Sequence, residues 1–204
     1  MGSGATRRLI VIAPTRAACE TIELAFGLDL ETTLWKTHGA ELTALAEKFR
    51  EEEAAGTTGS VRRGFGIVAG TGTGKTLSIR PIAHTLLGTD ELRVGVINRE
   101  REATPESPSW NVVIVTTGIA RRWFQDGDIR PQDALVVDEI HQTSAELELC
   151  LALGKRVGCR FIWLSATVDP SFYAGYLDAA EVLESYAFDP TRAADVKIIR
   201  KDPL

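Results

Sequence analysis

The sequence predicts an α/β fold in which a mostly parallel central sheet carries helices on both faces. Short apolar runs alternate with helical patterns along most of the 204 residues, and this alternation is typical of such sheets. Hydrophobic residues make up 44% of the chain and charged residues 25%, as in ordinary globular proteins. No apolar run approaches the roughly 20 residues that a membrane-spanning helix needs. We therefore expect one domain with no membrane partner.

Each predicted strand is a short apolar run rich in β-branched or aromatic residues. The seven runs span 9–13, 65–68, 93–97, 112–115, 134–137, 161–164 and 196–199. Between the first two runs, hydrophobic residues spaced three or four apart predict helices over 18–26 and 42–49. Gly27 follows the first of these helices as a stop signal.

Two further helices are predicted from their end signals. One is expected to start in the loop at Lys75 and to run to Leu87, because Gly88 offers a C-cap. The segment Thr-Ser-Ala-Glu at 143–146 predicts a capping box in front of a well-buried helix over 147–153.

Charge and cysteine content limit the classes of function. The formal net charge is -5 and the pI is near 5.3, so any nucleic-acid binding must be local rather than spread over a basic surface. Three cysteines without C-x-x-C spacing argue against a disulfide framework and against a zinc site. They are expected to be buried thiols in a reducing, intracellular compartment, the cytoplasm. The four tryptophans lie in or beside apolar segments, so packing is their predicted role.

The segment 65–76 has the pattern of a strand, a glycine-rich turn and the start of a helix. Its loop comprises Ala69, Gly70, Thr71, Gly72, Thr73, Gly74, Lys75 and Thr76. Glycines let backbone N–H groups point at phosphate oxygens, Lys75 can reach the outer phosphates, and the Thr76 hydroxyl can ligate Mg²⁺. Ala69 stands where the usual pattern has a glycine, and the alternative is a flexible Gly-Thr linker. A linker would not need a buried strand before it, so a phosphate-binding loop is preferred.

Two carboxylates follow the apolar run 134–137. Parallel sheets place their ligands at the carboxyl ends of strands, where Asp138 could hold Mg²⁺ and Glu139 could deprotonate the water that attacks a terminal phosphate. An isolated Asp-Glu pair would more simply cap a helix. Beside the loop that carries Lys75, the pair instead predicts a hydrolytic site with Glu139 and Lys75 as its catalytic residues.

Together these motifs resemble those of the DExH-type superfamily 2 helicases. AGTGTGKT is similar to motif I of that family, DEIH to motif II, and the segment Ser165, Ala166 and Thr167 to motif III. The resemblance implies a RecA-like P-loop NTPase lobe that binds and hydrolyses ATP with Mg²⁺. It also implies that His141 couples the nucleotide site to motif III, and that Ser165 and Thr167 link hydrolysis to movement between lobes. The alternatives are a surface histidine and an ordinary helix cap.

Two further segments are similar to the nucleic-acid-binding motifs of the same family. APTR at 13–16 is similar to motif Ia, and VVIVTTGIARRW at 112–123 is similar to motif Ib. The candidate contact residues are Pro14, Thr15, Arg16, Thr116, Thr117 and Gly118. The resemblance implies salt-sensitive, largely sequence-independent binding of a single strand, with RNA favoured over DNA because Gln142 follows DEIH. Arg121 and Arg122 are further candidates, although each could be a solvated surface charge.

The APTR segment stands in an unusual place for this family. There the motif Ia strand follows the motif I helix, whereas here the run 9–13 precedes the loop 69–76. A missing strand would leave backbone groups of a parallel sheet unpaired. We therefore expect a circular permutation or transposition in which the N-terminal strand fills the vacant position in the sheet. The alternative is an unrelated edge strand.

The resemblance also sets the expected domain organisation. We expect residues 1–204 to form a single RecA-like helicase lobe, with 1–60 as an N-terminal strand-helix segment and 61–204 carrying motifs I, Ib, II and III. A second RecA-like lobe, acting in cis or in trans, would supply an arginine finger; without it we expect an ATP hydrolase of low activity. The alternatives are a stand-alone ATP-dependent binding or oligomerisation module without helicase activity, and a P-loop NTPase unrelated to nucleic acid.

Overall fold

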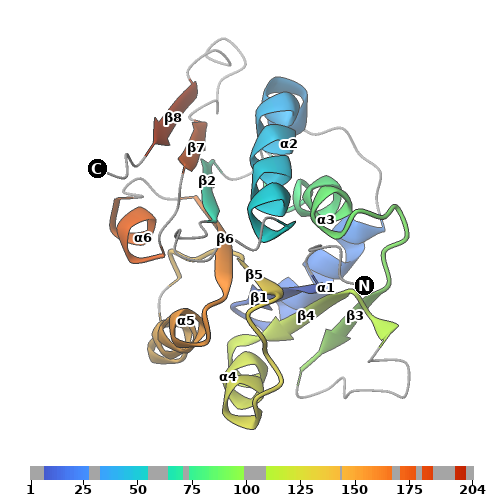
Figure 1. Cartoon of the computed structure of the whole chain (residues 1–204), viewed down its shortest axis with the longest axis vertical. Coiled ribbons are helices and arrows are strands. Elements are labelled where there is room, and N and C mark those ends of the chain that lie inside the picture. Colours follow the sequence, from blue (N-terminus) through green and yellow to red (C-terminus); the bar gives the residue numbers. More distant parts are fainter. Residues whose placement is uncertain are drawn as a thin grey trace.

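A computed structural model of the chain describes residues 7–27, 33–54, 64–70, 74–98, 109–142, 144–166, 171–177, 181–185 and 196–200. The strands are β1 (Arg8–Ala13), β2 (Phe65–Ala69), β3 (Val94–Ile97), β4 (Val112–Thr116), β5 (Asp133–Val137), β6 (Arg160–Ser165), β7 (Glu181–Ser185) and β8 (Val196–Arg200). They form one sheet in the order β3-β4-β1-β5-β6-β2-β7-β8 (Figure 1). All are parallel except β8, which pairs antiparallel with β7.

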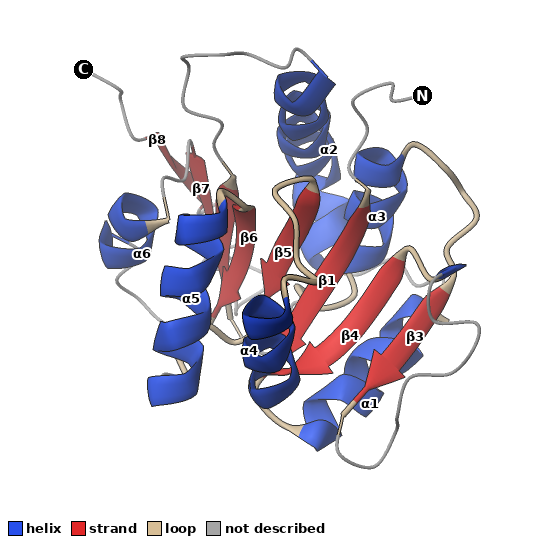
Figure 2. Ribbon diagram, turned by 60° about the horizontal axis from the view of Figure 1, so that its bottom comes forward, coloured by secondary structure: helices blue, strands red, loops and turns tan. Residues whose placement is uncertain are grey.

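Helices cover both faces of this sheet (Figure 2). They are α1 (Arg16–Phe26), α2 (Thr33–Ala54), α3 (Ile79–Leu87), α4 (Thr117–Asp126), α5 (Ala145–Val157) and α6 (Ser171–Tyr176). The first three pack in one hydrophobic cluster and the last three in the other. The predicted architecture, an α/β fold with a mostly parallel central sheet flanked by helices on both faces, is thus confirmed. Every helix within the described ranges is too short or too polar to span a lipid bilayer.

The N-terminal strand β1 lies inside the sheet, between β4 and β5, as predicted from the backbone groups that a gap would leave unpaired. Leu9 is in register with Val112 on one side and with Ala134 on the other. Beyond the end of β5, the Asp138 N–H still donates to the Ile12 carbonyl oxygen at 3.1 Å. The strand therefore also helps to place the first of the two predicted carboxylates.

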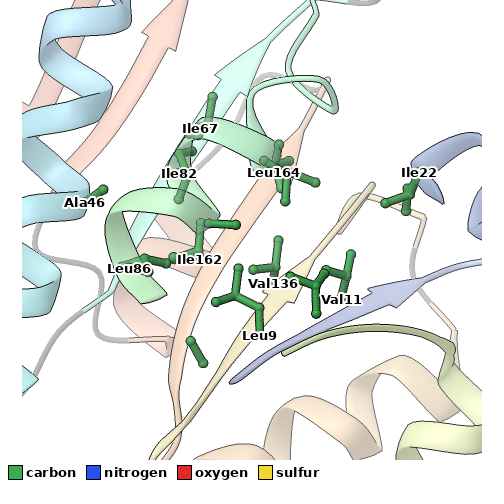
Figure 3. Packing of buried hydrophobic residues seen from close by; sticks show 14 of the residues in the cluster. Leu9, Val11, Ile22, Ala46, Ile67, Ile82, Leu86, Val136, Ile162 and Leu164 are labelled. Carbon is green, nitrogen blue, oxygen red and sulfur yellow. The ribbon is translucent and has the colours of Figure 1, made fainter. Parts of the chain in front are cut away.

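Side chains of the inner strands alternate between two cores, one on each face of the sheet. Leu9 and Val11 of β1 join Ile67 of β2 and Ile162 of β6 on the α1–α3 side (Figure 3). Ile10 of β1 packs instead on the α4–α6 side, as do the other alternate residues of these strands. Both faces of the sheet are thus buried, and this explains the nearly continuous apolar runs in the sequence. The three cysteines lie buried in these cores, and none of them forms a disulfide.

Three expectations about helices are wrong in detail. The helix after the glycine loop begins at Ile79 rather than at Lys75, because residues 75–78 form hydrogen-bonded turns in which the Ser78 N–H donates to Gly74 O. The N-cap of α5 is Ser144, whose side chain accepts from the Leu147 N–H, so the capping box at 143–146 does not form. α5 is also amphipathic rather than well buried, since only one side of it meets the sheet and α4.

Three elements were not predicted: α4, α6 and β7. α4 begins directly after β4, within the motif Ib-like segment, and Gly127 ends it in the left-handed conformation at φ 76°. β7 has the sequence EVLES and forms a parallel ladder with β2. Its two adjacent apolar residues, Val182 and Leu183, stand between polar ones, and this short run does not have the alternation typical of a strand.

Candidate functional site

The predicted site residues gather at the carboxyl edge of the sheet, where β2, β5 and β6 end. Gly74 has φ 91°, a left-handed conformation that favours glycine, and it leads into the turn that carries Lys75 and Thr76. Thr71, Gly72, Thr73 and Thr167 were also predicted here, and they lie outside the described residues. Ala69 is the last residue of β2, and Gly70 follows it directly.

The loop and the two carboxylates are in direct contact. The Lys75 Nζ lies 3.4 Å from Glu139 Oε1, and Lys75 is only 6% exposed. The side chain of Asp138 is hydrogen-bonded to that of Thr76. The pair Lys75 and Thr76 follows β2, and the pair Asp138 and Glu139 follows β5, yet the four residues form one polar cluster. They meet because only β6 lies between β2 and β5 in the sheet.

Burial sets the electrostatics of Asp138. Loss of hydration raises its pKa from 3.8 to about 6, and the neighbouring Glu139 carboxylate adds to the rise. The Lys75 ammonium group and hydrogen bonds from the Glu139 backbone and Thr76 act in the opposite direction. The positive charge of Lys75 and these hydrogen bonds therefore do not offset the effect of burial and of Glu139 on the Asp138 carboxylate.

The residues present fit a divalent cation. Asp138 Oδ1 is buried without a hydrogen-bond partner, although its pKa shows that the carboxylate would gain from added positive charge. Thr76 and Asp138 are hard oxygen donors of the kind that Mg²⁺ prefers, and Mg²⁺ commonly takes one or two protein ligands beside water and phosphate oxygens. Among the described residues no group of three or more His, Cys, Asp or Glu side chains is arranged to hold a metal.

Glu139 is held in an unusual backbone conformation. Its φ is 52°, and it is the one non-glycine residue with positive φ in the described ranges. Such a conformation costs on the order of 1 kcal/mol or more and persists where surrounding contacts impose it. Here the Ile140 N–H donates to Leu164 O at 3.0 Å and the Tyr173 hydroxyl donates to Ile140 O at 3.3 Å. These bonds turn the chain sharply after β5 and aim the Glu139 side chain at Lys75.

His141 joins Glu139 to the segment after β6. Its Nε2 lies 2.9 Å from Glu139 Oε2, and its Nδ1 lies 3.3 Å from both the Ser165 Oγ and the Ala166 backbone nitrogen. Because the Ala166 N–H can only donate, Nδ1 must accept. The other ring nitrogen, Nε2, then serves as the donor to Glu139. A continuous chain of contacts runs from Ala166 to Lys75.

A cavity of about 630 Å³ lies on the same edge of the sheet, over the ends of β1 and β4. Its lining includes all six candidate nucleic-acid contacts, namely Pro14, Thr15, Arg16, Thr116, Thr117 and Gly118. Arg121 and Arg122 of α4 line it too, so these eight residues share one surface. Thr15 also caps α1 by accepting from the Ala18 N–H at 3.0 Å, which fixes its hydroxyl oxygen while leaving the hydroxyl proton available.

A smaller cavity of about 240 Å³ connects the two groups of residues. Thr15 and Thr117 line one part of it, and Asp138 lines another. Ile12 and Leu147 contribute apolar wall. The carboxylate cluster and the threonine-lined surface are therefore neighbours across a single small space.

Sequence reasoning missed several residues of this edge. Glu146 was assigned to a capping box, but its carboxylate accepts from the Thr117 hydroxyl at 3.4 Å and lies 3.4 Å from Arg121 Nε. Gln142 and Ser144 line the smaller cavity, and Tyr173 supports the turn after β5. No local pattern marks these residues, because each meets its partners only through the packing of α4, α5 and α6.

The fold and the site together define a class: an α/β domain with a lysine-bearing loop after one inner strand and paired carboxylates after another, as in nucleotide-hydrolysing proteins. No protein family model matches the chain, and no curated protein matches it. Among solved structures, the genome packaging NTPase B204 from Sulfolobus turreted icosahedral virus 2, in complex with ATP-gammaS, is similar at 16% identity. That match has a TM-score of 0.38 and covers 62% of this chain and 76% of the packaging NTPase.

The UvsW helicase from bacteriophage T4 is similar at 14% identity, with a TM-score of 0.33. The match covers 87% of this chain and 54% of the helicase, so the chain spans about half the length of that protein. The function must therefore be argued from the geometry of this chain's own site.

Proposed function

We propose that the chain is the ATP-binding and ATP-hydrolysing motor lobe of a DExH-type nucleic-acid helicase. The observation that carries the proposal is the cluster of Lys75, Thr76, Asp138 and Glu139, in which Lys75 and Glu139 are 3.4 Å apart and a buried oxygen of Asp138 has no partner. A purely structural ion pair would not need the glycine-rich turn at Gly74 or the strained backbone of Glu139.

In this proposal the loop 69–76 binds the triphosphate of ATP. Backbone N–H groups and the Lys75 ammonium group contact phosphate oxygens, and Thr76 with Asp138 holds Mg²⁺. The ion supplies positive charge that stabilises the charge developing on the phosphates. Binding of that charge also relieves the unfavourable burial of the Asp138 carboxylate.

Glu139 is the proposed general base. During hydrolysis a water oxygen bonds to the terminal phosphorus, the bond to the bridging oxygen breaks, and Glu139 accepts the proton of the water. Glu139 must first leave Lys75, and triphosphate oxygens are the natural replacement partners for that ammonium group. His141 keeps the other carboxylate oxygen oriented through its Nε2 proton, so it acts as a positioning residue between Glu139 and Ala166.

The cavity that contains Arg16 and Thr117 is the proposed binding surface for a single strand of nucleic acid, with RNA preferred. Hydroxyl, backbone N–H and guanidinium groups at this surface suit phosphate oxygens rather than base edges. Its closeness to Asp138 across the smaller cavity gives a short route by which strand binding and hydrolysis can influence one another.

A second RecA-like lobe, in cis or in trans, belongs to the same proposal and would complete the ATP site. The isolated chain should then hydrolyse ATP slowly, because an arginine finger contributes about 10³-fold or more in related phosphoryl transfers. The second candidate function is a stand-alone ATP-dependent binding or oligomerisation module. It is favoured by the Lys75–Glu139 contact, which holds the base away from productive use in this conformation.

The test is steady-state ATP hydrolysis with and without single-stranded RNA or DNA, with Lys75→Ala as the blank. Stimulation by one nucleic acid, lost in Arg16→Ala and Thr117→Ala but kept in the α5 surface control Arg156→Ala, would support the helicase lobe. Nucleotide binding without turnover or stimulation would favour the binding module. Failure to bind ATP in a folded chain would overturn both.

A further inference from the structure

Another cavity, of about 590 Å³, lies at the opposite edge of the sheet from the Lys75 cluster. Its lining comes from the amino ends of β1 and β4, from α4 and the segment between α4 and β5, and from residues next to β3, whose last residue, Ile97, also lines it. Since β1 has six residues and a strand rises about 3.3 Å per residue, roughly 20 Å separates the two edges. The cavity is therefore distinct from both sites proposed above and shares no residue with them.

Positive charge is concentrated on this cavity. The arginines that line it are Arg7, Arg8, Arg93 and Arg130. Arg7 and Arg8 contact the buried Asp133, at 2.7 Å and 3.3 Å, so one carboxylate serves two guanidinium groups. Asp128 is the one acidic residue in the lining. The cavity thus carries excess positive charge in a chain whose total charge is -5.

Two of these arginines are available to a ligand. The Arg93 side chain is 47% exposed; within the described ranges its ion-pair partner is Glu91, 4.0 Å away and itself 79% exposed, and its Nε donates to the Ser109 carbonyl oxygen. Arg130 is exposed, and within the described ranges no carboxylate lies at ion-pair distance from its guanidinium group. An exposed ion pair such as Arg93–Glu91 contributes little to folding stability. A structural role therefore explains Arg7 and Arg8, which contact a buried carboxylate, better than it explains Arg93 and Arg130.

Two tryptophans complete the lining. The Arg8 guanidinium group lies over the Trp123 ring of α4, with the Arg8 Cζ 5.3 Å from the ring centroid. Trp110 packs over Gly95 of β3, where any Cβ would collide with the indole ring. Both indoles are only partly buried. Aromatic faces beside arginines are the groups that bind bases and phosphates of nucleotides without sequence preference.

We propose that this cavity binds a nucleotide unit, with its phosphate on Arg93 and Arg130 and its base on the indole face of Trp110. The unit is either a free mononucleotide or part of a single strand, since the two share this chemistry. A strand that reached this cavity would have to follow the side of the molecule that carries α4, between the two edges of the sheet.

Isothermal titration calorimetry at low salt tests the proposal, with thymidine 5′-monophosphate, hexathymidylate and inorganic phosphate as probes. The full chain carries Lys75→Ala and Arg16→Ala, which remove binding at the other two proposed sites. Adding Arg93→Gln and Arg130→Gln should weaken binding by about tenfold or more, because charge-assisted phosphate contacts are lost. Arg156→Gln on α5 is the matched control and should change nothing. Thermal melting verifies that each variant is folded.

The three probes and two tryptophan variants separate the outcomes. Equal affinity for the mononucleotide and the oligonucleotide identifies a free nucleotide as the ligand, and binding of the oligonucleotide alone identifies a strand. Trp110→Phe should retain affinity and Trp110→Leu should lose about fivefold or more, since stacking needs an aromatic face. Equal affinity for inorganic phosphate, no binding of any probe, or binding unchanged by Arg93→Gln and Arg130→Gln would overturn the proposal.

Discussion

In the absence of metal and nucleotide, replacing Asp138 with asparagine should raise the free energy of unfolding. Asp138 is 5% exposed, and burial is the main cause of the rise in its pKa, followed by the charge of Glu139. At neutral pH the folded chain must therefore keep this carboxylate ionised at a cost in free energy. Asparagine has nearly the same shape and carries no charge, so it removes that cost.

The magnitude follows from the pKa. A rise from 3.8 to about 6 corresponds to about 3 kcal/mol at 25 °C. This is an upper limit, because the asparagine amide must still occupy a position where one carboxylate oxygen has no partner. We expect about 2 kcal/mol, which for a chain of this length raises the melting temperature by about 4–8 °C.

The difference between variant and wild type should depend on pH. Because the folded-state pKa of Asp138 is raised above its unfolded value, folding takes up a proton between about pH 4 and pH 6. Wild-type stability gains from this uptake as the pH falls through that window. The advantage of Asp138→Asn should thus be full above about pH 6, fall to a small fraction near pH 4, and vanish well below the unfolded pKa of 3.8, where the carboxyl group is protonated in both states.

Thermal melting in EDTA, at several values between pH 4 and pH 7.5, measures the effect. Asp133→Asn is the matched control, since Asp133 is also buried on β5 but accepts hydrogen bonds from Arg7, Arg8 and the Arg130 N–H. That substitution should destabilise the chain, because two arginines lose their shared carboxylate. If Asp138→Asn melts at or below the wild type at pH 7, or if its advantage is as large at pH 4 as at pH 7, the reasoning is wrong.

Three further predictions concern catalysis, reactivity and packing. Glu139→Gln should reduce ATP hydrolysis by about 100-fold or more while nucleotide affinity, measured by calorimetry, changes little; equal loss of both would contradict the role of base. Burial, with the charge of Glu146 adding to it, raises the pKa of Cys150 to about 12, so iodoacetamide at pH 8 should label this thiol only in the unfolded chain, as judged by mass spectrometry. Gly66→Ala should destabilise the fold by about 1–3 kcal/mol in denaturant melts, because its Cβ would overlap the Trp163 ring; unchanged stability would show that the ring can move.

Local patterns in the sequence determined the strands and the chemistry of the candidate site. An apolar run such as 9–13 is short and buried on both faces, so its conformation follows from its composition. Asp138 and Glu139 follow such a run directly, and Lys75 and Thr76 follow another across the glycine-rich loop. The end of a strand is a feature that sequence can locate, and parallel strands bring such ends to one edge.

Only the tertiary structure decided how these pieces meet. Pairing between strands depends on partners distant in the chain, so the pattern EVLES could not reveal β7 and the capping box could not exclude Ser144 as the N-cap. The strained φ of Glu139 arises from bonds made by its neighbour Ile140 to β6 and α6.

The contrast is sharpest between the two edges of the sheet. At the carboxyl edge, residue types adjacent in sequence already suggest their chemistry. At the amino edge, Arg93, Trp110 and Arg130 belong to different loops and carry no motif, and they line one cavity because β3, β4 and β5 run parallel with β1 between the last two. Sequence determines what each segment can do, whereas long-range strand pairing decides which segments act together.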